Sequence, residues 1–248
     1  MAGFWGVPER PRRAGVQGAQ PHGGVWGVPR QSLLTLYLWE REEVTMDKID
    51  FILAGVGGQG IILMSDLLAE TALAAGFDVK KSDVHGMAQR GGSVVSYVRL
   101  GDRVLSPLPR AGDVDFLVGL EKLETARWAP ALRKGGVAVV NDHAILPLSV
   151  SAGADRYPTD AQVMGSLRGR TDRVYWVDGV GLSAGLGNPK VLNVIILGFL
   201  ASLLPMRWDA WLDTLTRRVP AKYRDLNVRA LEAGRRAAEG HAVLERPG

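Results

Sequence analysis

The chain has 248 residues, of which 46% are hydrophobic and 23% charged, a composition that suits one large globular domain. It contains no cysteine, which excludes disulfides, thiolate nucleophiles and any iron–sulfur or zinc site ligated by its own thiolates. The four histidines are widely separated, the net charge is +4 and no dense Lys/Arg cluster occurs, so we expect neither a metal site held by this chain alone nor a nucleic-acid partner.

Residues 1–45 differ in composition from the rest of the chain. They are rich in Gly, Pro and Arg, show no helical or strand period, and carry WGVP twice, at residues 5–8 and 26–29. We predict a poorly ordered N-terminal extension without a signal peptide, then an α/β domain over residues 46–240 and a tail over 241–248. Met46 opens the first well-patterned strand and is a candidate for the true start.

From residue 47 onward, apolar runs alternate with helical periods. This pattern predicts a single Rossmann-like domain, with a mostly parallel open sheet, helices on both faces and a helical C-terminus. The first strand is expected in "IDFILAGVG", the first helix over residues 60–76, and a short second strand in "FDVKK". "SVVSYVRLG" alternates, and the Gly101-Asp102 pair at its end is typical of a turn, which predicts the start of a hairpin.

Two fully buried strands are expected next, in "VDFLVGL" and "GGVAVVN", with a helix between them that Pro130 interrupts. A polar stretch then precedes a further strand, "DRVYWVDG", and helices are expected over residues 190–204, 208–218 and 222–239. The most apolar stretch, residues 191–206, is shorter than the ~20 residues that cross a bilayer. We therefore expect a buried helix there and a cytoplasmic protein.

A glycine-rich turn follows the first predicted strand. "AGVGGQG" places Gly55, Gly57 and Gly60 at the spacing G-x-G-x-x-G, directly before a helix. Glycines here permit a sharp turn and present backbone N–H groups at a helix start, which stabilises an anion. The alternatives are a tight corner without a ligand, and NAD binding. NAD binding expects an acidic residue at the end of the second strand, where Lys80 and Lys81 stand instead.

The second candidate site is the connection "SDVHGMAQRGGSVV", Ser82 to Val95. Its glycines allow unusual dihedrals, Gln89 and Arg90 offer donors, and it follows a strand at the carboxyl edge, where open α/β sheets bind ligands. A nucleophilic serine activated by His85 is disfavoured, because neither a GxSxG elbow nor a triad spacing occurs. A capped turn with a solvated Arg90 is the alternative.

Two pairs of carboxylates have a spacing that invites an acid–base interpretation. Asp113 and Asp115 flank the start of a buried strand, and Glu121 and Glu124 lie three apart at a helix start. Compensation of the helix dipole is the favoured explanation, and catalysis the alternative.

These motifs carry a resemblance to a known family. "GVGGQG", "SDVHGMAQRGGSVVSYVRLG" and "GNPKVLNVIILG" resemble, in this order, the gamma subunit or domain of 2-oxoacid:ferredoxin oxidoreductases. The small beta subunit of indolepyruvate:ferredoxin oxidoreductase is the most similar member. The resemblance runs from residue 47 to about residue 239 and includes "NVRALEAG" near the end.

The resemblance implies an enzyme that decarboxylates a 2-oxoacid oxidatively with thiamine diphosphate, passes electrons through iron–sulfur clusters to ferredoxin, and forms an acyl-coenzyme A. This chain has neither cysteines nor a GDG…NN thiamine motif, and "VDGVGLSAGLGN" does not match one. The thiamine diphosphate, Mg²⁺ and clusters are therefore expected in a larger catalytic subunit. This chain is expected to be a non-catalytic partner in a hetero-oligomer, without a membrane anchor.

The residues that match the family motifs are the candidate site residues, with no catalytic residue and no metal ligand among them. They are Gly55, Gly57, Gly58, Gln59 and Gly60 in the turn; Ser82, His85, Gly86, Gln89, Arg90, Gly91 and Gly92 in the loop; and Asn188, Pro189 and Asn193 in the third motif. The hypothesis is that the turn and the loop line the seam with the catalytic subunit and help to shape the coenzyme A or acyl pocket.

Three alternatives remain for the function. The first is the gamma subunit of a pyruvate, 2-oxoglutarate or branched-chain 2-oxoacid:ferredoxin oxidoreductase. The second is a stand-alone NAD(P)-dependent reductase, and the third is a pure assembly scaffold. The absent acidic residue argues against the reductase, and a scaffold would tolerate alanine at every motif residue.

Overall fold

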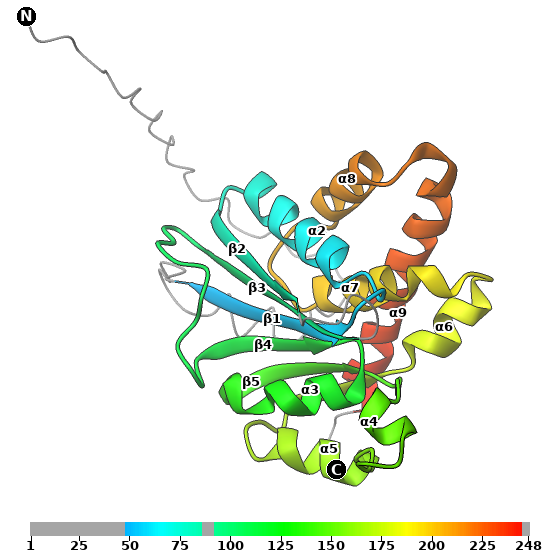
Figure 1. The fold of residues 1–248 in the computed structure, drawn as a ribbon. Coiled ribbons are helices and arrows are strands. Elements are labelled where there is room, and N and C mark those ends of the chain that lie inside the picture. The colour runs from blue at the N-terminus through cyan, green and yellow to red at the C-terminus, as the bar shows by residue number, and fades with distance from the viewer. Residues whose placement is uncertain (1–47, 86–91, 245–248) are drawn as a thin grey trace, which may run out of the picture. The chain divides into compact units, whose positions relative to one another are not determined.

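The computed structural model describes residues 48–85 and 92–244, which form an open α/β sheet with helices on both faces (Figure 1). The six strands are ordered β2-β3-β1-β4-β5-β6, and only β3 runs antiparallel to its neighbours. This confirms the predicted mostly parallel sheet. The strands are β1 (Ile49–Val56), β2 (Asp78–His85), β3 (Ser93–Gly101), β4 (Val114–Gly119), β5 (Leu132–Asn141) and β6 (Val174–Val177).

The helices divide between the two faces of the sheet. One face carries α2 (Ile61–Ala74), α6 (Gly179–Gly185), α7 (Leu192–Ala201), α8 (Trp208–Arg218) and α9 (Arg224–Leu244). The other face carries α3 (Lys122–Trp128) and α5 (Asp160–Arg168), and the short α4 (Leu148–Ser151) lies between them in sequence. Three 3-10 turns, η1 (Ala129–Ala131), η2 (Pro189–Val191) and η3 (Ala221–Tyr223), precede β5, α7 and α9.

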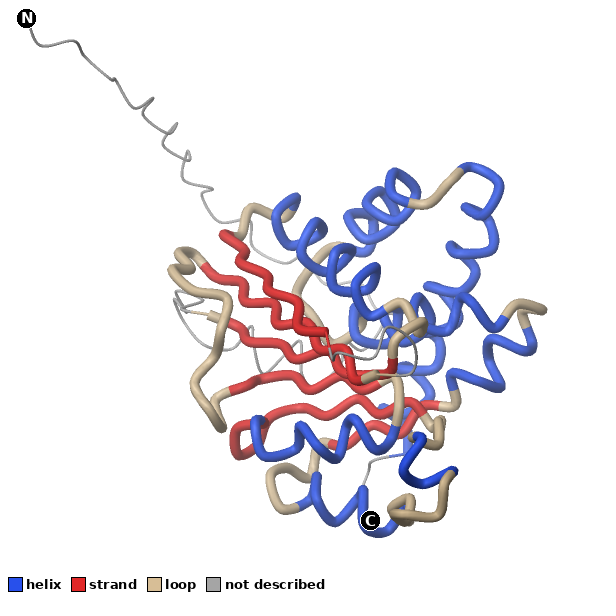
Figure 2. The backbone as a smooth tube through the Cα atoms, viewed as in Figure 1, coloured by secondary structure: helices blue, strands red, loops and turns tan. Residues whose placement is uncertain are grey.

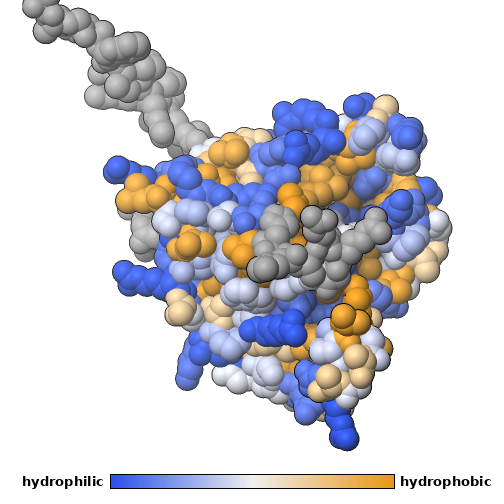
Figure 3. Space-filling model, viewed as in Figure 1, coloured by the Kyte–Doolittle hydropathy of each residue, from blue (hydrophilic) through white to orange (hydrophobic). Residues whose placement is uncertain are grey.

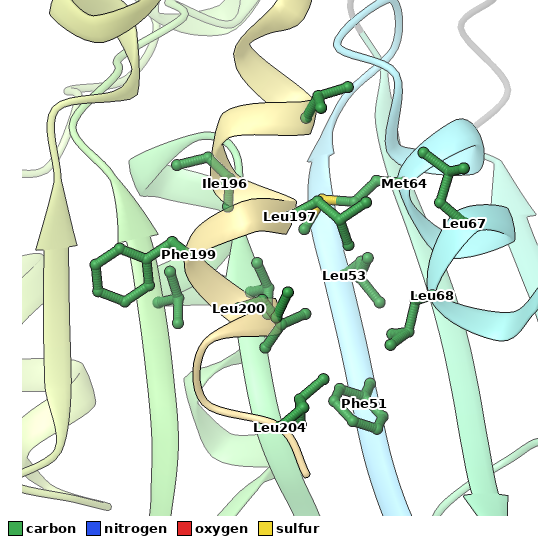
Figure 4. Close-up of a cluster of buried hydrophobic side chains, with 14 of the residues drawn as sticks. Phe51, Leu53, Met64, Leu67, Leu68, Ile196, Leu197, Phe199, Leu200 and Leu204 are labelled. Carbon is green, nitrogen blue, oxygen red and sulfur yellow. The ribbon is translucent and has the colours of Figure 1, made fainter. Parts of the chain in front are cut away.

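The alternation of side chains along β1 creates two cores. Phe51 and Leu53 face the larger layer of helices, where Figure 4 shows them opposite Met64 and Leu68 of α2. Ile52 and Ala54 point to the opposite face and belong to the second core, which packs against α3 and α5. Phe51 also stacks on Phe116 of β4, with ring centroids 5.0 Å apart. β1 is buried along its whole length, and after the buried Asp50 it is a continuous run of residues without polar side chains.

The apolar helix α7 is packed against α9 through two glycines. A Cβ atom on Gly198 would lie 2.0 Å from the carbonyl oxygen of Leu231, and one on Gly234 would lie 1.9 Å from that of Ile195. Neither backbone leaves room for a side chain, so the two helices touch directly. From Asn193 to Ala201 every residue of α7 is buried, as its composition predicted.

The connection between β2 and β3 is shorter than the sequence suggested. Ser82–His85 complete β2 rather than starting a loop, because β2 pairs antiparallel with β3 through His85↔Val94 and Ser82↔Tyr97. β3 is thus the second strand of a hairpin that begins with β2, and not the first strand of a hairpin that turns at Gly101. Its other edge pairs with β1, which leaves no free edge for the segment that follows.

Other differences concern short helices whose sequences have no regular apolar period. The segments of α4, α5 and α6 were not predicted as helices, although Thr159 and Gln162 form a capping box at the start of α5. α3 ends at Trp128 and Pro130 falls in η1, as expected from a proline. α8 has its predicted bounds, whereas α9 continues beyond Glu239 to Leu244.

The predicted N-terminal extension, with Met46, lies outside the described residues. Within residues 48–85 and 92–244, no helix combines the length and the apolarity that a membrane span requires.

Candidate functional site

The glycine turn joins β1 to α2 at the carboxyl edge of the sheet. Gly58 and Gly60 have φ angles of +100° and +81°, a region that favours glycine. Gly57 N donates to the carbonyl oxygen of Gly92 at 2.9 Å, which ties the turn to the residue before β3. Gly60 is the N-cap of α2, and the first turn of this helix has neither a capping side chain nor an acidic residue. The helix start is therefore electrostatically open to an anion.

Gln59 stabilises the turn through hydrogen bonds of both polar atoms of its side chain. Its Oε1 accepts from Val56 N at 2.7 Å, and its Nε2 donates to the carbonyl oxygen of Leu120 at 2.9 Å. Both polar ends of the side chain are thus used by the backbone of β1 and by the end of β4. A Cβ atom on Gly55 would lie 2.7 Å from Gln59 Oε1, so the first glycine makes room for this side chain.

Of the two asparagines of the third motif, only Asn193 contacts the turn. Its buried side chain donates from Nδ2 to the carbonyl oxygen of Gly60 at 3.2 Å, across 133 positions in sequence. A Cβ atom on Gly60 would lie 2.5 Å from the same nitrogen. Asn188 instead caps η2, because its Oδ1 accepts from Lys190 N at 3.0 Å. Pro189, next to it, is the first residue of that 3-10 turn.

A buried asparagine that the sequence analysis did not single out extends this arrangement. Asn141, at the end of β5, donates from Nδ2 to the carbonyl oxygen of Leu120 at 3.0 Å. Its Oδ1 accepts from Gly179 N, at the start of α6, at 3.1 Å. An Asn that ends an apolar strand and is followed by an acidic residue was the available signal, but only the sheet order reveals its partners.

The candidate residues of the loop are described only in part. Gly86, Gln89, Arg90 and Gly91 lie outside the described residues, and His85 is described only by its backbone pairing. Ser82 shares a sheet face with Tyr97, its cross-strand partner. Gly92 contacts the turn as stated above.

The start of β3 is tied to α3 by a buried carboxylate. Ser93 Oγ donates to Glu124 Oε2 at 2.6 Å, and Arg127 Nη1 donates to Oε1 of the same carboxylate at 2.6 Å. Glu124 is only 3% exposed. Ser93 therefore anchors the end of the connection, and its partner is a carboxylate that is already paired with Arg127 and not a histidine.

The sheet order argues against the dinucleotide alternative. In a dinucleotide-binding domain the second strand lies next to the first, so that its acidic end reaches the ribose. Here β3 separates β2 from β1. Lys80 pairs with Asp78 at 2.9 Å and Lys81 with Asp83 at 2.9 Å, so both lysines are already compensated.

Glu121 is a structural cap. Its Oε2 accepts from Glu124 N at 2.8 Å, which makes it the N-cap of α3 as the dipole explanation predicted. Its Oε1 accepts from Ile145 N at 3.1 Å and from the hydroxyl of Tyr157. Burial, and then the Glu121 carboxylate, raises the pKa of the Tyr157 phenol well above its usual value. The phenol therefore stays protonated and acts as a donor.

Asp113 and Asp115 belong to ion pairs at the opposite, amino edge of the sheet. Asp113 Oδ2 accepts from Lys48 Nζ at 2.7 Å, and this bond lowers the pKa of the Asp113 carboxyl group. Asp115 accepts from Arg133 Nε at 2.6 Å and from Asp50 N at 2.8 Å. Neither pair has the geometry of a catalytic dyad.

We call residues 142–160, which follow β5, the lobe. Lys122 Nζ forms ion pairs with Asp142 at the start of the lobe, at 3.0 Å, and with Asp160 at its end, at 2.7 Å. Between them, Ile145 N donates to the Glu121 carboxylate. Two leucines of this fixed segment nevertheless face solvent: Leu148 is 85% exposed and Leu146 is 56% exposed.

Exposed apolar side chains gather at the same edge. Among the described residues, nine large hydrophobic side chains are exposed, and five belong to segments at the carboxyl edge: Ile62, Val84, Leu146, Leu148 and Val180. Figure 2 shows the connections after β5 and β6 at this end of the strands and the β3–β4 connection at the other. On the side of the molecule that Figure 3 draws, apolar patches alternate with polar ones.

The described part of the edge combines backbone groups, carboxamides and apolar side chains with the hydrogen-bonded carboxylates of Glu121 and Glu124 and the ion pairs of Lys122. No group of three or more His, Asp or Glu residues with a metal-binding arrangement occurs in residues 48–85 and 92–244. The geometry defines an open α/β domain whose carboxyl edge is suited to contact with another molecule, and the start of α2 at this edge can accept an anion.

Comparison with known proteins assigns the family. The model of the pyruvate ferredoxin/flavodoxin oxidoreductase family matches residues 50–237. The chain belongs to this family. It is 35% identical to the indolepyruvate oxidoreductase subunit IorB of Archaeoglobus fulgidus, over 75% of this chain and 94% of the relative.

Two further comparisons agree with this assignment. The common gamma subunit of the pyruvate/ketoisovalerate oxidoreductases of Thermococcus kodakarensis is 24% identical over 59% of this chain and 73% of its own. The crystal structure of a keto/oxoacid ferredoxin oxidoreductase gamma subunit from Geobacter sulfurreducens has the same fold, with a TM-score of 0.58 and 23% identity over 77% of this chain and 99% of that one. The resemblance seen in the sequence motifs is thus confirmed, and the chain corresponds to a single subunit of such an oxidoreductase.

Proposed function

We propose that this chain is the accessory subunit of a thiamine-diphosphate-dependent indolepyruvate:ferredoxin oxidoreductase, and that the oxidative decarboxylation to an acyl-coenzyme A takes place in a larger partner subunit. One observation carries the proposal: an indolepyruvate oxidoreductase subunit matches over 94% of its length at 35% identity, against 24% for a pyruvate/ketoisovalerate subunit.

The residues of this chain do not fit the redox cofactors. Iron–sulfur clusters need thiolate ligands, and the sequence has no cysteine. The Mg²⁺ of a bound diphosphate needs several oxygen ligands, and the described residues offer no carboxylate cluster for it. We therefore assign thiamine diphosphate, Mg²⁺ and the clusters to the partner subunit, with ferredoxin as the acceptor reached through the complex.

The carboxyl edge is the proposed seam with that partner. The glycine turn, with its contacts to Gly92 and Asn193, and the exposed leucines of the lobe support this proposal. Exposed apolar side chains such as Leu146 and Leu148 are the kind of residue that an interface core buries. The open start of α2 suits a phosphate of coenzyme A or a carboxylate of the partner.

The first experiment compares the chain with and without a co-expressed indolepyruvate oxidoreductase large subunit. We expect no 2-oxoacid oxidation by the isolated chain, and thiamine-dependent oxidation by the complex with indolepyruvate preferred over pyruvate and 2-oxoglutarate. A preference for another 2-oxoacid would favour the gamma subunit of that enzyme instead. Activity of the isolated chain, or a nicotinamide tightly bound to it, would refute the proposal.

The seam is tested by two matched leucines. Leu148 at the carboxyl edge is 85% exposed and Leu105 at the amino edge is 82% exposed, so neither substitution should change stability by more than about 0.5 kcal/mol. We expect Leu148→Ser to weaken binding of the large subunit about tenfold, because an interface contact is lost, and Leu105→Ser to leave it unchanged. Pull-down titration measures both, and equal effects would place the seam elsewhere.

A further inference from the structure

Three carboxamide side chains at the carboxyl edge each pack against a glycine where a Cβ atom would collide. The pairs, with the distance from the added Cβ to the nearest amide atom, are Gln59 with Gly55 at 2.7 Å, Asn193 with Gly60 at 2.5 Å, and Asn141 with Gly179 at 2.5 Å. Distances this short leave no space for alanine without movement of the amide. The edge therefore depends on these three contacts being made together.

Asn141 occupies the central position. It has no exposed surface, and both of its polar atoms are bound to backbone groups of other elements, the Leu120 carbonyl at the end of β4 and the Gly179 N–H of α6. The Leu120 oxygen also accepts from Gln59 Nε2. One carbonyl oxygen thus connects the glycine turn to Asn141, and through it to α6.

α6 depends on this connection for its position. It has seven residues, and a helix of that length is not stable by itself. Asp178 caps it by accepting from Gly181 N at 2.7 Å, but Asp178 is exposed and is part of the same segment. α6 follows β6 directly and packs against α7 through Leu182 and Leu186, and the bond from Gly179 N to Asn141 links its first turn to the end of β5, next to the exposed Val180.

We propose that Asn141 is a positioning residue of the seam. It fixes the first turn of α6, and so Val180, relative to the glycine turn, and presents both to the partner subunit as one rigid surface. This inference rests on the proposed function, because the seam is part of that function. Gln59 acts on the same acceptor from the other side, so the two amides form a coupled pair.

The first test uses substitutions that remove both hydrogen bonds of Asn141 or only one of them. Asn141→Ala removes both hydrogen bonds, whereas Asn141→Asp keeps the acceptor for Gly179 N and loses the donor to Leu120. Asn227→Asp is the matched control, because it also removes an amide donor to a backbone carbonyl, at 2.9 Å, but in an exposed part of α9. The full-length variants are titrated against separately purified indolepyruvate oxidoreductase large subunit.

We expect Asn141→Ala to raise the Kd for the large subunit about tenfold or more, because the start of α6 is released. Asn141→Asp should recover most of that loss at pH 5.5 and less at pH 8. Burial raises the pKa of the new carboxyl group above its usual value of about 3.9, and only the protonated form can donate to the Leu120 oxygen. Asn227→Asp should change the Kd less than twofold at both pH values.

Hydrogen exchange provides a readout that does not need the partner. The Gly179 amide should be protected in the wild type and in Asn141→Asp, and should exchange at least tenfold faster in Asn141→Ala while β1 and β4 keep their protection. Uniformly faster exchange of all strands would show a general structural role and overturn the proposal.

The outcomes separate the two proposals. A wild-type chain that does not bind the large subunit refutes the proposed function. A wild-type chain that binds it, with an Asn141→Ala variant that folds and binds equally well, refutes only the role of Asn141. An Asn141→Asp variant whose binding does not depend on pH would show that donation to Leu120 has no part in it, and would also overturn the coupling.

Discussion

The two edges of the sheet are stabilised by different chemistry. At the amino edge, charged groups are paired within the chain: Asp50 is fully buried and binds Arg99 and Lys48, and Asp115 binds Arg133. At the carboxyl edge, neutral amides bind backbone groups and leucines face solvent, while the charged groups beside them, Glu124 and Lys122, are already paired within the chain. Covering a charge costs more free energy than covering an amide already bonded or an alkyl group, so the carboxyl edge is the one suited to burial by a partner.

The largest effect is expected from breaking the charge pairs of the amino edge. Arg99→Met keeps an apolar stem but leaves the buried Asp50 carboxylate with only Lys48, which should lower the free energy of unfolding by about 3–5 kcal/mol. Urea denaturation measures this. Arg207→Met is the control, since Arg207 is 86% exposed and pairs with an exposed Asp209. If the two variants lose equal stability, the amino edge is not the electrostatic centre of the fold.

A smaller effect is expected at the tie between the lobe and α3. Tyr157→Phe removes one donor from the buried Glu121 carboxylate and leaves Ile145 N bound to it, so the free energy of unfolding should fall by about 1–3 kcal/mol. The variant should also bind the large subunit more weakly, because the lobe carries Leu148. Tyr223→Phe, at a tyrosine that is 45% exposed, should change neither quantity. If Tyr157→Phe loses stability but binds the large subunit as tightly as the wild type, the lobe is not part of the seam.

The smallest effect belongs to the exposed pair of Lys48 and Asp113. The side chains are 38% and 44% exposed, so Asp113→Asn should lower stability at pH 7 by less than about 1 kcal/mol. The pKa of Asp113 is lowered in the folded state, so its contribution is present above the unfolded pKa of about 4 and disappears as the pH falls further. The difference between wild type and variant should vanish near pH 3 and in about 1 M salt. A difference that persists there would have another cause.

Local pattern was enough to predict most of the elements. The apolar runs of β1, β4 and β5 and the period of α8 are encoded in neighbouring residues, because burial on both faces or on one helical stripe requires them. The helices α5 and α6 were not predicted, because their sequences lack a regular apolar period. These helices are marked by the caps Thr159 and Asp178 and not by an apolar period.

The candidate site was predictable only in part. Gly58 and Gly60 were found because positive φ angles demand glycine, and this demand is local. The contacts of Gln59 and Asn193 were not predicted: Gln59 was expected at the seam and Asn193 only as a residue of the third motif, and their side chains bind the backbone at Leu120 and Gly60. Asn141 gave no sequence signal beyond its position at a strand end.

The sequence by itself determined the class of fold, the glycine turn and the lack of thiol ligands, because each depends on residue identity or on the spacing of near neighbours. Only the tertiary structure decided that β3 lies between β2 and β1, that the loop is a hairpin connection, and that one carbonyl oxygen joins Gln59 to Asn141. Those contacts bring together residues far apart in the chain. Their partners are chosen by the order of the strands, which no local pattern encodes.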